Sequence, residues 1–364
     1  MLTIDGSYLE GGGQIVRTAL ALSTLTGIPF RCIDIRKGRK DTGLKAQHLT
    51  AIKALEELCG AQCEGAALGA TEITFYPKPI KKFRHTIDIG TAGSISLLLQ
   101  SLLPPLLFAE KNVSLTIIGG TDGLWAMPID YMQAVLLPQL QRFTKIDMKM
   151  TKRGYYPKGG GVVDLKIKPF WKKYASFEDL LLTLRKEVIP YHFDKQKKLL
   201  CIKGISHASM DLQNAKVAER QTHAAKALFH TVDCPIKIDT AYSQTLSTGS
   251  GITLCALFGD EEEDQRNPMR LGADALGEKG KKAEIVGEEA AKKLLHEIQS
   301  GAAVDIHLAD NILPYLALCG GKIHTSTISL HAKTNIWVIE KFLGEIFTVE
   351  NTYISVLAAH EENI

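Results

Sequence analysis

One histidine near the C-terminus combines a reactive side chain with a position where a strand is expected to end. His331 follows an apolar, β-branched run and precedes Lys333, Thr334 and Asn335. A neutral imidazole, with an unperturbed pKa of about 6.5, is a competent nucleophile at neutral pH. Its attack on the α-phosphorus of a nucleoside triphosphate would form a phosphoramidate that stays reactive, because imidazolium is a good leaving group. Taken alone, such a histidine is more often a satisfied structural residue.

A dense group of basic residues lies far upstream, in the sequence RKGRKDTG. Arginines and lysines occupy four of the five positions in residues 36–40, and Gln47 follows shortly after them. Arginine suits phosphate because its planar guanidinium grips two oxygens at once. This pattern makes Arg36 and Arg39 candidate phosphate ligands, and a solvated loop is the usual alternative for a charge run.

The sequence GSYLEGGGQIVR opens an expected helix with three consecutive glycines. Glycines allow a ligand to approach the backbone closely, and a helix N-terminus favours anions. Glu10 could hold a metal ion, and Arg17, one helical turn beyond Gln14, could face the same site. A tight turn with a surface Glu and Arg is an equally good interpretation of this spacing alone.

Two further stretches contain groups suited to a nucleoside. In GGTDGLWAMPIDY, Pro128 and Tyr131 could stack on a base, or the stretch could be a turn whose Trp125 packs on the core. In HLADN, Asp310 could bond a ribose hydroxyl or cap the helix that follows.

An internal repeat positions these candidates. Three segments share one pattern, which consists of an apolar helix, a β-branched strand, a polar turn, a second helix and hairpin-like strands. The expected first helices cover residues 11–27, 91–108 and 307–321, and the third unit has an expected strand at 324–330.

The repeat also aligns the three polar turns, at residues 36–43, 119–128 and 331–335. If the units pack around a pseudo-threefold axis, the ends of three strands converge on one crevice, a favoured place for ligands in α/β folds.

The repeat defines the expected domain organisation. The large domain covers residues 1–180 and 301–364, with repeats at about 1–80, 84–170 and 301–364, and a smaller α/β domain is inserted at 181–300.

Composition narrows the class of protein. The 364 residues are 45% hydrophobic and 23% charged, with a net charge of only +3, so any nucleic-acid site must come from local clustering.

The sequence has no apolar run long enough to span a membrane and does not begin with a secretory signal. Its seven scattered cysteines lack zinc spacing. We therefore expect a cytoplasmic protein that is not bound to a membrane. The oligomeric state stays open, with a homodimer as one option.

Several motifs together resemble one known family. The stretches EGGGQIVR, GLKAQHLTA, GGTD, GYYPKGGG, ISHAS and LHAKTN are similar to the RNA 3′-terminal phosphate cyclase family, in order and over nearly the whole chain. The resemblance implies an α/β (α+β) fold of three repeated units, each with two helices and a four-stranded sheet, and an inserted smaller α/β domain.

The resemblance also implies a ligase that uses ATP. It would convert an RNA 3′-terminal phosphate to a 2′,3′-cyclic phosphodiester through a covalent histidine-AMP and an RNA(3′)pp(5′)A intermediate, releasing pyrophosphate and AMP. The partners implied are RNA 3′-phosphate ends and a divalent metal ion, Mg or Mn.

Residue roles carry over motif by motif. The nucleophile falls on His331 and the metal ligand on Glu10. RNA and phosphate contacts fall on Arg17, Arg36, Arg39 and Gln47. Nucleotide contacts fall on Gln100, Met127, Pro128, Tyr131, His307, Leu308, Ala309, Asp310 and Asn311. The sequence departs from the family pattern at Met127, His307 and Asn311, where a proline, a tyrosine and a glutamine are common. We expect these changes to alter the adenine contacts without removing them.

Two other functions remain open at this point. A cyclase-like branch of the family serves ribosome assembly and lacks the nucleophilic histidine, whereas His331 is present here. An enolpyruvyl-transferase-like enzyme also builds its domains from repeated α/β units, but the insertion and the histidine turn argue against it.

Overall fold

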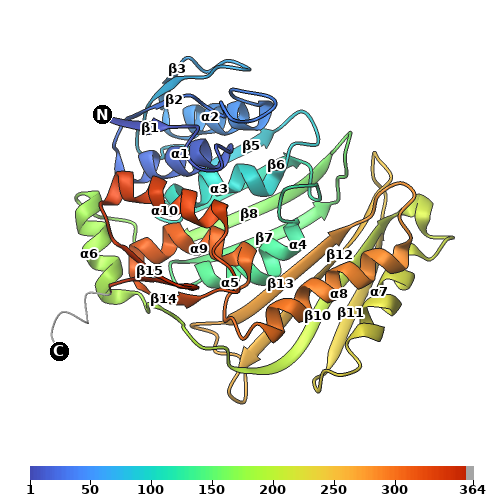
Figure 1. Ribbon diagram of the computed structural model, residues 1–364. Coiled ribbons are helices and arrows are strands. Elements are labelled where there is room, and N and C mark those ends of the chain that lie inside the picture. Colours follow the sequence, from blue (N-terminus) through green and yellow to red (C-terminus); the bar gives the residue numbers. More distant parts are fainter. Residues whose placement is uncertain (358–364) are drawn as a thin grey trace.

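The structure is a computed structural model that describes residues 1–357. Figure 1 shows a body of helices and small sheets, and beside it a second layered part with long strands. The first unit consists of β1 (Leu2–Asp5), α1 (Gln14–Thr26), β2 (Phe30–Ile33), α2 (Ala46–Cys59), β3 (Gln62–Glu64) and β4 (Ile73–Tyr76). Its sheet has the order β1-β2-β4-β3, in which only the β1–β2 pair is parallel.

The second unit repeats this topology. It consists of β5 (Arg84–Asp88), α3 (Ile95–Leu106), β6 (Val113–Gly119), α4 (Ile129–Tyr131), η1 (Met132–Leu136), α5 (Leu137–Leu140), β7 (Thr144–Lys152) and β8 (Gly161–Pro169). The sheet order is β5-β6-β8-β7, again with one parallel pair, β5–β6.

The second helix of this unit is divided into the short segments α4, η1 and α5. Pro138 has no N–H to donate to the carbonyl of Ala134, and the chain forms the π-helical segment η1 just before it. The carbonyl of Ala134 instead accepts a hydrogen bond from Nη1 of Arg270 at 2.6 Å. A proline inside the helix thus provides an acceptor for a side chain of the inserted part.

The third unit has the same sheet, with one strand from an unexpected place. It consists of β9 (Tyr191–Phe193), α9 (Ile306–Cys319), β14 (Gly321–His324), α10 (Leu330–Leu343), β15 (Phe347–Glu350) and β16 (Tyr353–Val356). The sheet order is β15-β16-β14-β9, and β9 pairs in parallel with β14. The sequence analysis placed β9 in the insertion. The insertion instead separates this first strand from the first helix of the same unit. Residues 358–364, which the expected third unit included, lie outside the described part.

The turn that carries His331 is also different from the expectation. The predicted strand over residues 324–330 is wrong, because β14 ends at His324 and α10 already begins at Leu330. The Oγ of Ser329 accepts a hydrogen bond from the backbone N–H of Ala332 at 2.8 Å and so caps the helix. His331 therefore lies in the first turn of α10, and the stretch 331–335 is helix.

The inserted part forms its own sheet. After α6 (Phe177–Glu187), which packs against α9, it consists of β10 (Lys198–Ser209), η2 (Met210–Leu212), α7 (Val217–Leu228), β11 (Ile236–Ser243), β12 (Ser250–Gly259), β13 (Met269–Leu276) and α8 (Ala283–Gln299). The order is β11-β10-β12-β13. α7 and α8 cover one face, and the other face packs on α4 and η1 of the second unit (Figure 1). The exact domain division stays a prediction.

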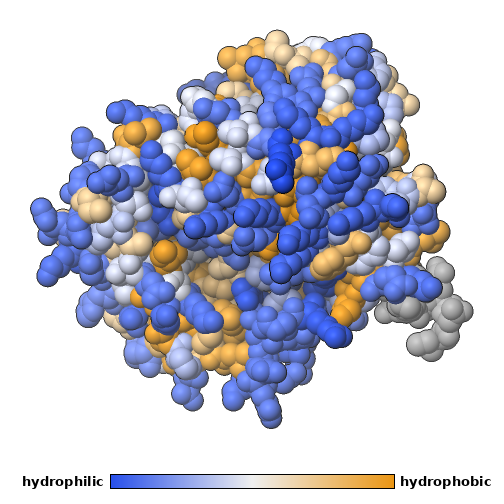
Figure 2. Space-filling model, turned by 180° about the vertical axis from the view of Figure 1, so that it is seen from behind, coloured by the Kyte–Doolittle hydropathy of each residue, from blue (hydrophilic) through white to orange (hydrophobic). Residues whose placement is uncertain are grey.

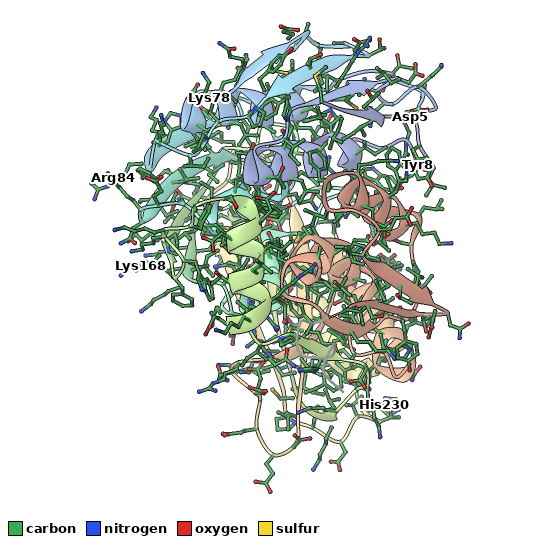
Figure 3. The ribbon with its side chains drawn as sticks, turned by 90° about the vertical axis from the view of Figure 1, so that its left-hand side faces the viewer. Asp5, Tyr8, Lys78, Arg84, Lys168 and His230 are labelled. Atoms are coloured by element: carbon green, nitrogen blue, oxygen red, sulfur yellow. The ribbon has the colours of Figure 1, made fainter. Side chains whose placement is uncertain are left out.

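The helices of the three repeated units meet at the centre of the larger body. α1 contacts α3 and α10, and α9 contacts α3 and α10. Their facing side chains, such as Leu20, Leu99 and Leu316, are fully buried. The face turned away from the viewer in Figure 1 is largely hydrophilic (Figure 2). Arg84 and Lys168 of the second unit project outward from the molecule (Figure 3). Among the described residues, no helix has the length and apolar character needed to cross a bilayer.

Candidate active site

His331 faces the first helix of the first unit across the centre of the fold. Its Nδ1 lies 2.9 Å from Oε2 of Glu10 and makes a short contact with Oε1 of Gln14. Nε2 of Gln14 donates to the backbone carbonyl of His331 at 3.1 Å. Because both atoms near Nδ1 are acceptors, the proton of the neutral ring belongs on Nδ1, and Nε2 keeps its lone pair.

The imidazole of His331 is half-exposed, so a ligand can reach it. Desolvation and the cations Arg17 and Arg39 lower its pKa below the usual value, while Glu10 opposes the shift. A lowered pKa keeps the ring neutral and nucleophilic at neutral pH.

A chain of hydrogen bonds joins all three units beside this histidine. Nε of Arg17 in α1 donates to Oε1 of Gln100 in α3 at 2.8 Å. Nε2 of Gln100 donates to Oδ1 of Asn311 in α9, also at 2.8 Å. Burial, together with the nearby Arg36, lowers the pKa of Arg17 to about 10. The sequence analysis predicted all three residues as ligand contacts, and the structure brings them together.

A second chain fixes α10 against α1 and α9. The hydroxyl of Thr18 donates to Oδ1 of Asn335 at 2.7 Å, and Nδ2 of Asn335 donates to the backbone carbonyl of Asp310 at 2.7 Å. The side chain of Asp310 accepts from the hydroxyl of Ser329, the cap of α10. Burial raises the pKa of Asp310 to about 7. The predicted capping role of Asp310 is wrong, since Asp305 caps α9 through the N–H groups of His307 and Leu308.

The loop of residues 36–43, called the basic loop from here on, also contacts Glu10. Nη2 of Arg39 pairs with Oε1 of Glu10, and its Nε donates to the carbonyl of Glu10 at 3.1 Å. The guanidinium of Arg36 donates to the carbonyl of Asp41, and Gln47 is half-buried at the start of α2. Arg39 is thus paired with Glu10, whereas burial and Arg39 lower the pKa of Arg36 and the carboxylate of Asp41 opposes that shift.

His48, next to Gln47, is fully buried against the glycines that open α1. Its Nδ1 accepts from the backbone N–H of Lys45 at 3.0 Å, and Nε2 has no hydrogen-bond partner among the described residues. Burial, followed by the charge of Arg17, lowers its pKa to about 3. A Cβ at Gly13 would collide with this ring, which explains the need for glycine there. The neutral ring therefore directs an unpaired N–H toward the start of α1.

A cavity of about 490 Å³ opens beside His331, a volume suited to a nucleotide-sized ligand. It is lined by these predicted site residues: Arg17, Gln100, Met127, Tyr131, His307, Asp310, Asn311 and His331. The predicted residues Pro128, Leu308 and Ala309 do not line it, because their side chains are buried in the core. Glu10, Arg36, Arg39 and Gln47 are also outside it, on the side of the basic loop.

The inserted part supplies a wall of this cavity that the sequence analysis missed. Asp274 of β13 lines it, together with Lys281 and Lys293. Burial raises the pKa of Asp274 above its usual value. No sequence signal connected these residues to His331, because they share neither a motif nor a repeat position with it.

A separate cluster of buried charges lies between the second unit and the insertion. Nη1 of Arg153 donates to both carboxylate oxygens of Asp122, at 2.9 and 3.0 Å, and to Asp130 at 2.8 Å. His207 of β10 lies 3.3 Å from Asp122 through Nε2, and its Nδ1 pairs with the hydroxyl of Tyr155 at 2.7 Å. Asp122, Asp130 and His207 have the spacing of metal ligands, but the guanidinium already occupies their shared position.

With the geometry established, comparison with known proteins identifies the family. A family model described as RNA 3′-terminal phosphate cyclase matches residues 8–349. The chain belongs to the RNA 3′-terminal phosphate cyclase family. It is 44% identical over 351 residues to a protein of that name from Pyrococcus abyssi, covering 96% of this chain and 95% of that one. A protein of the same name from Methanosarcina barkeri is 46% identical over 354 residues, with 96% and 97% coverage.

Membership of the cyclase family confirms the predicted family and fold. It is a family of ligase-type enzymes that use ATP. Its members' name implies RNA 3′-phosphate ends as the substrate. The individual roles of His331, Glu10 and the arginines stay predictions, and the geometry above supplies their physical basis.

Proposed function

We propose that this chain cyclises RNA 3′-terminal phosphates through a covalent adenylate on His331. The observation that carries this proposal is the orientation of the imidazole. Its Nδ1 faces Glu10 and Gln14, so the unprotonated Nε2 is available toward the cavity. Arg17 and Arg39 lie close enough to lower the pKa of the ring and to attract phosphate groups.

In the first step, Nε2 of His331 attacks the α-phosphorus of ATP. A P–N bond forms, the bond to the bridging oxygen breaks, and pyrophosphate leaves with the electron pair. The Nδ1 proton stays on the ring, where the carboxylate of Glu10, 2.9 Å away, stabilises the positive charge that develops. The Gln14 amide, bonded to both the ring and the backbone of His331, holds the ring in this orientation.

In the second step, an oxygen of the RNA 3′-phosphate attacks the phosphorus of the adenylate. The P–N bond breaks, its electrons return to Nε2, and RNA(3′)pp(5′)A forms. Arg39, which pairs with Glu10, and Arg36 of the same loop would hold the incoming phosphate.

In the third step, the vicinal 2′-hydroxyl attacks the 3′-phosphorus. The hydroxyl proton is released, the bond to AMP breaks, and a 2′,3′-cyclic phosphodiester remains. Nucleophile and phosphorus belong to one nucleotide, so proximity supplies much of the rate. The site then needs only to hold the terminal phosphate and release AMP.

Glu10 fits a divalent metal ion of the Mg or Mn type. Its Oε2 is buried and, apart from its 2.9 Å approach to Nδ1 of His331, has no hydrogen-bond partner among the described residues, and its Oε1 pairs with Arg39. Mg²⁺ commonly binds one or two carboxylates together with substrate phosphates. Bound there, the ion would neutralise charge on the triphosphate.

Incubation with α-labelled ATP tests the proposal. We expect label on the protein that survives mild alkali, as a phosphoramidate does, and that disappears when an RNA with a 3′-phosphate is added. Retention of no label would instead support the cyclase-like ribosome-assembly function. Turnover of a small carboxylic substrate without ATP would support the enolpyruvyl-transferase-like alternative.

A further inference from the structure

Trp125 is placed unusually for so large an apolar side chain. It is 95% exposed, more than any other large apolar side chain among the described residues. It lies at the tip of a short turn in which Gly123 pairs with Ala126, on the loop between β6 and α4. The sequence analysis offered core packing as the alternative for Trp125, and the structure contradicts that alternative.

The backbone of Trp125 is also strained. Its φ angle is 68°, in the left-handed region that a turn usually gives to glycine or asparagine. A bulky residue there costs free energy, and in the free protein Trp125 recovers little of it through burial. Because burial does not offset this strain in the free protein, we expect the indole to make its contacts in the ligand-bound state.

The turn borders the cavity beside His331. Trp125 and Met127 line it, and so do Glu278 and Lys281 of the inserted part. The arginines of the basic loop, Arg36 and Arg39, do not line this cavity. The ligand nearest to the indole is therefore the one that fills the cavity, rather than the phosphate at the basic loop.

We propose that the indole of Trp125 stacks on the base of the nucleotide bound in this cavity. An indole offers a large flat surface that suits the flat face of a base, and such stacking excludes water from one face of the base. The inference rests on the proposed function, because that function makes ATP the occupant. It adds a base-contacting residue outside the contacts predicted from the sequence.

Fluorescence tests the contact directly and does not depend on catalysis. The chain has three tryptophans, and the double variant Trp171→Phe, Trp337→Phe leaves Trp125 as the sole one. We expect quenching of its emission, and protection from iodide, on titration with α,β-methylene ATP, which His331 cannot cleave. If the emission does not change with this nucleotide but changes with a 3′-phosphorylated oligonucleotide, the proposal is overturned in favour of an RNA contact.

Kinetics supply the second measurement. Trp125→Ala is expected to raise the KM for ATP in protein adenylation roughly tenfold, with little change in the maximal rate, and Trp125→Phe to restore much of it. The matched control is Phe170→Ala, an exposed aromatic outside the cavity, which should leave the KM unchanged. An unchanged KM in Trp125→Ala would overturn the proposal. Absence of adenylation in the unmodified chain would refute the proposed function instead, while the titration would still report binding.

Discussion

Two regions of the molecule bring histidine, carboxylate and arginine side chains together, and they differ in how fully their polar atoms are paired. In the region of His331 and the glycines before α1, Nε2 of His48 has no hydrogen-bond partner among the described residues. Oε2 of Glu10 has none beyond its 2.9 Å approach to Nδ1 of His331, whose ring is half-exposed. Between the second unit and the insertion, Arg153 and Asp122 are buried and bonded to each other.

The pKa shifts follow the same contrast. Burial alone would raise the pKa of Asp122, but Arg153 and His207 hold it well below its usual range. Near His331, burial lowers the pKa values of Arg17 and His48, and other cations lower them further. The charged groups of the buried cluster are thus bonded to one another, whereas the pKa values of Arg17 and His48 are set mainly by burial and by other cations. Polar groups that bind an anionic ligand are expected to lack partners in the free protein.

The sharpest test of the contrast is removal of the nucleophile. His331→Ala should reduce protein adenylation at least about a thousandfold, because the covalent step then has no acceptor atom. Labelled ATP gives the rate, and thermal melting should show an unchanged fold. The control His192→Ala, an exposed histidine on β9, should retain full activity. Persistent AMP transfer in His331→Ala would identify another residue as the nucleophile.

Removal of the buried guanidinium should act on stability instead. Arg153→Ala leaves two buried carboxylates without their partner and should cost about 3–5 kcal/mol of unfolding free energy. Urea denaturation measures this loss. The matched control is Arg31→Ala, whose solvent-exposed pair with Glu72 should contribute far less to stability. Equal effects in the two variants would contradict the contrast between the clusters.

Removal of an arginine at the basic loop should affect substrate use more than folding. Arg39→Ala is expected to weaken binding of the phosphorylated RNA end by about 1–3 kcal/mol, the range for one charged contact. Titration with RNAs that do and do not carry a 3′-phosphate measures it. Arg84→Ala, which removes an outward-facing arginine (Figure 3), is the control. Unchanged dependence on the 3′-phosphate would remove Arg39 from the site.

The smallest expected effect concerns pH. Desolvation lowers the pKa of His331, so the adenylation rate should rise with pH and level off above a midpoint below about 6.5. Below the midpoint the imidazole is protonated and its lone pair is lost. Glu10 raises this pKa, so Glu10→Gln should move the midpoint still lower. Single-turnover rates across the acidic range test both statements, and a midpoint above the usual histidine value would contradict them.

Much of the fold could be predicted from the sequence because it depends on local patterns of apolar and polar residues. Apolar spacing predicted α1, α3 and α9, and the repeated order of elements predicted three similar units. The start of α10 was missed, although Ser329 is a good capping residue, because the β-branched run before it favoured a strand. β9 was misplaced because a short strand becomes recognisable only by its pairing with β14.

The sequence by itself therefore determined the repeat and the chemical type of the candidate groups, including His331 and the arginines of the basic loop. Only the tertiary structure decided which atom of His331 is free, since that depends on Gln14, 317 residues away. It also decided that Arg153 is buried among carboxylates and that Trp125 borders the cavity. Local spacing encodes helices and turns, but contacts between distant segments form only when the whole core packs.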